Sequence, residues 1–128
     1  MRTTPHTPNN LSLLRQAAAM FALCLAAAST AQAMTIREMR ALEKTEKQGS
    51  TYTDYYLVGV MEGALEAHAQ AVRAGAPASI CLNGRRLEPS MAKNIYTSEL
   101  KRNADLYEAD FPVQLVVVNA LGTVYPCL

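Results

Sequence analysis

The positions of the cysteines constrain the fold of this chain more than any other feature. The sequence ends VYPCL, so Cys127 lies one residue before the last, where a chain end frays unless something holds it. The other two cysteines are Cys24 and Cys81. If Cys24 is removed with an N-terminal signal, only Cys81 and Cys127 remain, and a disulfide between them has one possible connectivity.

Residues 1–33 have the features of a secretory signal peptide. Arg2 and Arg15 precede an apolar run of about 13 residues, too short to span a bilayer, and an A-x-A cleavage site ends at Ala33. We therefore expect cleavage after Ala33. The signal has a bacterial form, which predicts a periplasmic protein. An uncleaved anchor and a lipoprotein signal at Cys24 are the alternatives.

The remaining segment, 34–128, has the length of one domain. Loss of Arg2 and Arg15 leaves ten of the twelve Lys and Arg residues against all eleven Asp and Glu, a net charge near −1. This balance does not favour nucleic acid or an anionic membrane as a partner. We expect no membrane attachment after cleavage.

In an exported protein, Cys81 and Cys127 are expected to form a disulfide. The closed loop would contain about 47 residues, which the chain-entropy relation values at roughly 4 kcal/mol. The bond would hold the C-terminus against the middle of the chain. Two buried free thiols are the alternative, and the chain lacks a CxxC motif for thiol exchange.

Hydrophobic spacing predicts an all-α fold, a small bundle of about four helices around a central helix, stapled by one disulfide. The first helix is expected within 35–49 with Gly49 as its stop, and the second and central one within 50–75, capped by Ser50 or Thr51. Pro89 or Ser90 would open the third, over 91–103.

The last segment, 113–125, is ambiguous. Its β-branched run from Val116 to Val118 suits a buried strand, but no other segment offers a partner strand. A helix is therefore expected, capped by Asp110 and with an apolar stripe at Phe111, Leu115, Val118, Leu121 and Tyr125.

The central helix is predicted to be apolar on two sides, so that other helices contact it from more than one direction. It contains Gly59 and Gly63, each of which costs about 1 kcal/mol in a helix relative to alanine. Close packing of a second helix against these two glycines would explain them.

No catalytic, cofactor-binding or metal-binding residues are predicted, and we do not expect an enzyme. His68 is the only histidine after the signal and has no second histidine or nearby cysteine to complete a metal site. Glu62 and Glu66 form an i,i+4 pair that is expected to be a solvated stripe rather than an acid–base pair.

Two groups of residues are candidates for binding a partner protein. Tyr52 and Tyr55 lie at the start of the central helix, and tyrosine is enriched at protein contacts, although core edges also use it. Asn83, Arg85 and Arg86 belong to the loop NGRR beside Cys81, where arginines would pair with acidic groups. A purely solubilising loop is the alternative.

The order of these segments resembles a known family. A signal peptide precedes the run YYLVGVMEGALEA, a middle cysteine, a helix with IYTSEL and an end reading NALGTVYPC. This resembles the periplasmic amidase-immunity proteins of bacterial type VI secretion, the Rap/Tai-like family, over 52–127. Members often carry proline two residues after the middle cysteine, where this chain has Asn83.

The resemblance implies a helical immunity protein that binds a cognate peptidoglycan amidase effector and occludes its active-site cleft. It also implies homodimers for some members. An acid-activated periplasmic chaperone, also small, helical and disulfide-bonded, is the leading alternative. An enzyme of unknown type is a third interpretation.

Overall fold

The structure is a computed structural model that describes residues 15–16 and 33–128. The predicted signal peptide, with Cys24, lies outside the described residues apart from positions 15, 16 and 33. Residues 33–128 form one unit. Its elements are α2 (Ile36–Thr45), α3 (Gly49–Arg73), α4 (Met91–Arg102), the 3₁₀ turn η1 (Ala104–Leu106) and α5 (Val113–Val124). The predicted all-α bundle with one disulfide is confirmed.

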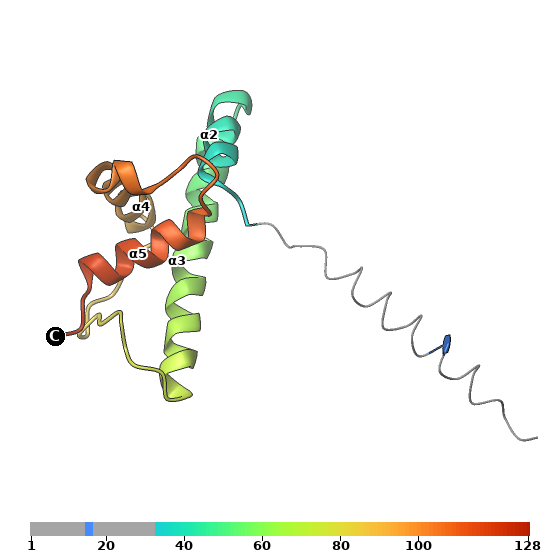
Figure 1. The fold of residues 1–128 in the computed structure, drawn as a ribbon. Coiled ribbons are helices and arrows are strands. Elements are labelled where there is room, and N and C mark those ends of the chain that lie inside the picture. Colours follow the sequence, from blue (N-terminus) through green and yellow to red (C-terminus); the bar gives the residue numbers. More distant parts are fainter. Residues whose placement is uncertain (1–14, 17–32) are drawn as a thin grey trace, which may run out of the picture. The chain divides into compact units, whose positions relative to one another are not determined.

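Helix α3 is the central element. It contacts α2, α4 and α5, and α4 also packs against α5. Figure 1 shows α2 beside the N-terminal part of α3, and α5 crossing α3 near its middle. The C-terminal half of α3 extends beyond the other helices, and the chain after it returns toward the C-terminus. The predicted central helix is therefore surrounded along only part of its length.

Burial explains why 113–125 is a helix despite its valines. The buried positions of α5 recur at helical spacing and are at most 1% exposed; they are Val113, Val116, Val117, Ala120 and Leu121. Burying an aliphatic side chain contributes roughly 1.5–3 kcal/mol, more than the helix propensity of valine opposes. The predicted stripe was wrong at two positions, because Leu115 and Val118 are 48% and 40% exposed.

The same core continues through the other elements. Its remaining buried apolar members are Ile36, Met39, Leu57, Met61, Ile80, Ala92, Ile95, Tyr96 and Tyr125. Ile80 and Tyr125 lie outside the helices, on the two segments that the disulfide joins. Each of the two segments that the disulfide joins therefore contributes a side chain to the core.

Helix α2 begins with a capping box that the hydrophobic pattern did not reveal. The Thr35 hydroxyl accepts a hydrogen bond from the Glu38 amide at 3.2 Å, and the Glu38 carboxylate accepts one from the Thr35 amide at 2.7 Å. These hydrogen bonds hold the pKa of Glu38 below its ordinary value. The start of α2 is thus fixed by two reciprocal bonds.

Gly49 begins α3 rather than ending α2. A Cβ at this position would meet the carbonyl oxygen of Leu42 and the Cα of Glu43. Glycine is therefore required where the chain turns back tightly against α2. The expected cap at Ser50 or Thr51 was wrong, because Gln48 is the N-cap and makes no side-chain cap bond.

Asp110 does not cap the last helix. Pro112 is the N-cap of α5, and the Asp110 carboxylate instead pairs with the guanidinium of Arg37 at 2.8 Å. The pair holds the pKa of Asp110 below its ordinary value. The helix starts here because Pro112 ends the preceding turn with a fixed φ of −66°.

Candidate partner-binding surface

The Cys81–Cys127 disulfide fixes the frame from which the NGRR loop projects. The two Cα atoms are 5.0 Å apart. Beside the bond, the Cys81 amide donates to the carbonyl oxygen of Tyr125 at 2.8 Å. Tyr125 is 5% exposed. The C-terminal segment is thus held by a covalent bond, a backbone hydrogen bond and a buried ring.

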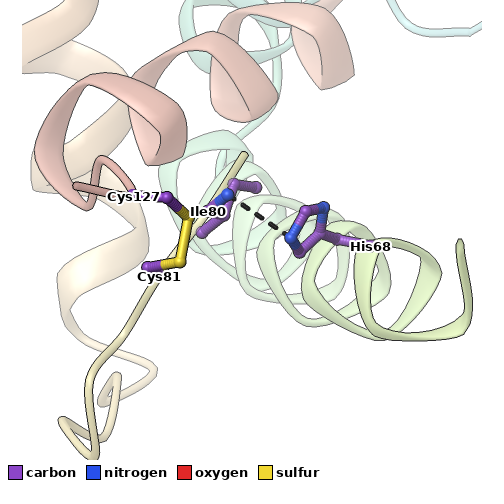
Figure 2. The surroundings of a disulfide bond; sticks show 4 residues. All are labelled: His68, Ile80, Cys81 and Cys127. Atoms are coloured by element: carbon purple, nitrogen blue, oxygen red, sulfur yellow. Dashed lines mark hydrogen bonds between the residues drawn. A yellow bond between two sulfur atoms is a disulfide. The ribbon is translucent and has the colours of Figure 1, made fainter. Parts of the chain in front are cut away.

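His68 ties the segment before Cys81 to helix α3. Its Nε2 accepts a hydrogen bond from the Ile80 amide at 3.3 Å, one residue before the disulfide (Figure 2). This gives the only histidine of 34–128 a structural contact. Within 15–16 and 33–128, no three His, Cys, Asp or Glu side chains are grouped to hold a metal ion.

The NGRR loop opens with a tight turn. The Arg85 amide donates to the Leu82 carbonyl at 3.0 Å, and the two residues between them have positive φ, 52° at Asn83 and 78° at Gly84. Positive φ at both central positions is typical of a type I′ turn, for which Asn-Gly is the preferred pair. Asn83 therefore has a conformational role. Proline cannot adopt this φ, so a proline at position 83 would be incompatible with the turn.

The two arginines of the loop differ in their contacts. The Arg85 guanidinium lies over the Tyr125 ring, 4.8 Å from its centroid, and Arg85 Nε donates to the Leu82 carbonyl at 3.0 Å. Arg86 is exposed, and no ion pair or side-chain hydrogen bond joins it to the described part of the chain. Arg85 stabilises the loop, which leaves Arg86 as the free cation.

Tyr52 and Tyr55 are both exposed, at 51% and 75%. Tyr52 donates its hydroxyl to the Gln48 side chain at 3.3 Å. Tyr55 lies with Pro89 and Ser90 around a hollow of about 280 Å³. The connection that carries Arg86 ends at Pro89 and Ser90, so Tyr55 of α3 lies beside the end of this connection that follows the arginine loop.

The predicted close packing at Gly59 and Gly63 is not present within the described domain. Both glycines are exposed, and a Cβ at either would meet nothing within 4 Å. The prediction failed because no other described element packs against α3 at these two glycines. Glu62 and Glu66 are exposed as expected, and Glu66 pairs with Arg73 at 2.9 Å.

A polar cluster that sequence reasoning missed lies between α4 and α5. Glu99, on α4, is 2% exposed. Its Oε1 accepts hydrogen bonds from Asn103 Nδ2 at 2.8 Å and from the Tyr107 hydroxyl at 2.7 Å. Asn119, on α5, donates from Nδ2 to the Tyr107 hydroxyl at 3.2 Å. Burial and the bond to Glu99 raise the pKa of Tyr107.

A partial signal for this cluster was present in the sequence. Glu99 falls four residues after Ile95 and three after Tyr96, so helical spacing places it on the same face as these two apolar residues. A charged residue at a core position indicates a special role, but its partners are set by how α5 docks. Spacing within α4 alone does not predict that contact.

Comparison of the chain with protein-family models, with curated proteins and with solved structures finds no match. None of the helices described for 33–128 is both long enough and apolar enough to cross a membrane.

Proposed function

We propose that this chain is an exported immunity protein that binds a cognate peptidoglycan amidase of type VI secretion in the periplasm and sterically blocks its active-site cleft. It performs no chemistry of its own. The proposal starts from the resemblance of 52–127 to the Rap/Tai-like immunity family. Export through the N-terminal signal would place the protein where such an effector acts.

The observation that supports binding best is the exposed connection from Cys81 to Ser90. A disulfide and a type I′ turn fix one end, with Arg86 exposed beside them. The other end adjoins the 75%-exposed Tyr55. A preorganised loop loses little conformational entropy on binding, and arginine and tyrosine carry much of the energy at protein interfaces.

The test begins with affinity capture, using the oxidised, exported protein as bait against proteins secreted by its source strain. The captured protein is then purified, and its hydrolysis of peptidoglycan is measured with and without one equivalent of bait. We expect one stoichiometric partner whose activity falls on binding. Many unrelated clients, captured mainly after acid treatment, would instead favour the chaperone.

Variants localise the interaction. Arg86→Glu and Tyr55→Ala should each weaken inhibition at least tenfold, which corresponds to about 1.4 kcal/mol. Lys47→Glu is the matched control for charge, because Lys47 is exposed, takes part in none of the ion pairs of the described residues, and lies on the turn between α2 and α3 rather than on the connection from Cys81 to Ser90. Equal inhibition by Arg86→Glu and the unaltered protein would exclude this surface.

A further inference from the structure

The buried carboxylate of Glu99 is only half satisfied. Oε1 accepts two hydrogen bonds, whereas Oε2 is covered by protein and has no hydrogen-bond partner among the described residues. A buried charge is costly unless it is paired. The three ion pairs of the described chain involve Asp110, Glu66 and Asp54, so none of them supplies a cation to Glu99.

Glu99 lies in the wall of an open groove of about 440 Å³ between α4, η1 and α5. The groove also has exposed apolar side chains, Leu106 at 70% and Val118 at 40%. Asn119 lines it too, and because its Nδ2 donates to Tyr107, its Oδ1 remains an acceptor. The groove therefore combines an apolar edge with an acidic, acceptor-rich wall.

We propose that this groove binds an arginine side chain of a partner protein, with the Glu99 carboxylate as its counter-ion. The aliphatic stem would lie against Leu106 and Val118, and the guanidinium would reach the carboxylate. Arginine fits better than lysine, because its planar fork of five N–H donors serves several acceptors at once. Glu99 Oε2 is covered in this structure, so contact with it requires a small shift of the groove wall.

This inference goes beyond the proposed function. The groove shares no lining residue with the hollow beside Tyr55. It does not require the partner to be an amidase, so either proposal can fail alone.

The test uses n-butylguanidinium as the probe, titrated into the oxidised, exported protein and followed by ¹⁵N–¹H NMR. We expect saturable shifts at Leu106, Val118 and the side-chain amide of Asn119, with a dissociation constant on the order of 1–10 mM for a ligand of this size. The neutral analogue n-butylurea should bind at least tenfold more weakly. Equal binding of the two probes, or shifts confined to other residues, would overturn the proposal.

Glu99→Gln removes the charge while keeping the shape and the acceptor for Tyr107 and Asn103, and it should weaken probe binding at least tenfold. Glu62→Gln, on the exposed face of α3, is the matched control and should leave affinity unchanged. A second variant, Asn119→Leu, keeps Glu99 and removes an acceptor at an exposed position, and a several-fold loss is expected. Unchanged affinity in both Glu99→Gln and Asn119→Leu would show that the groove does not hold the cation.

Discussion

Loss of the disulfide should remove a large share of the stability of this domain. Cys81 and Cys127 are 46 residues apart, and the chain-entropy relation gives about 4 kcal/mol at 25 °C for a closed loop of this length. A small domain typically has only 5–15 kcal/mol in total. Replacing both cysteines with alanine should therefore lower the free energy of unfolding by about 4 kcal/mol.

The assay is urea unfolding at pH 7, followed by circular dichroism, of the oxidised protein and the Cys81→Ala/Cys127→Ala variant. Reduction provides the control, because it breaks the same disulfide while leaving the amino-acid sequence unchanged. Reductant should bring the unaltered protein to within about 1 kcal/mol of the variant, and it should not affect the variant.

Other contacts near the disulfide also hold the C-terminus, and their size decides which measured loss of stability would contradict this prediction. The Cys81–Tyr125 backbone hydrogen bond and the Arg85–Tyr125 stack also hold the C-terminus. Together they contribute about 1–2 kcal/mol by ordinary values for such contacts. A loss below about 1 kcal/mol on removing the disulfide would mean that these contacts suffice and that the cross-link does not restrict the unfolded chain.

Three further predictions concern single residues. Gly49→Ala should destabilise the fold by at least about 2 kcal/mol, because its Cβ would strike α2, whereas Gly63→Ala should stabilise it by about 0.5–1 kcal/mol; thermal unfolding of the pair compares a crowded glycine with an open one. The pKa of Asp110 is lowered in the fold, so the unfolded chain binds more protons in acid than the folded chain does. The contribution of Asp110 to the free energy of unfolding is therefore present at neutral pH and is lost as the pH falls below the ordinary value of 3.8. Asp110→Asn should flatten this pH dependence, which urea unfolding at intervals of about one pH unit between pH 5 and pH 2 would measure. His68→Ala should cost about 1 kcal/mol and speed hydrogen exchange of the Ile80 amide, and unchanged exchange would contradict the assigned contact.

The helices could be predicted because their signals lie within each segment of the sequence. The disulfide could be predicted because only one pairing of its cysteines is possible. Apolar residues at helical spacing, with Gly75 and Pro77 after the central helix, indicate where helices form. Two cysteines allow one pairing. The last segment was also predicted as a helix, although its buried stripe was displaced, because hydrophobic spacing allows two overlapping faces and only the docking of α4 and α3 selects one.

The errors share one physical cause, which is that they depend on how elements meet. In the sequence, Gly49 has the pattern of a helix stop and Asp110 that of a helix cap. The structure shows instead that Gly49 packs against α2 and that Asp110 pairs with Arg37. Gly59 and Gly63 suggested a close helix contact, yet α3 extends past the rest of the bundle. Of the predicted loop residues, Asn83 adopts the positive φ of the turn and Arg85 stacks on Tyr125, so both have a structural role. Arg86 makes no such contact within the described residues.

Residues that destabilise the domain and make no compensating contact within it are the strongest candidates for function, since departures from ordinary packing and pairing occur mainly at functional sites. Glu99 is the clearest case. Glu99→Gln keeps an acceptor for Asn103 and Tyr107 and removes a buried charge, so it should raise the free energy of unfolding at pH 7 by on the order of 1 kcal/mol. Urea unfolding measures this directly. A stabilised variant that binds the guanidinium probe less well would separate function from folding, whereas a destabilised one would show that the charge serves the fold.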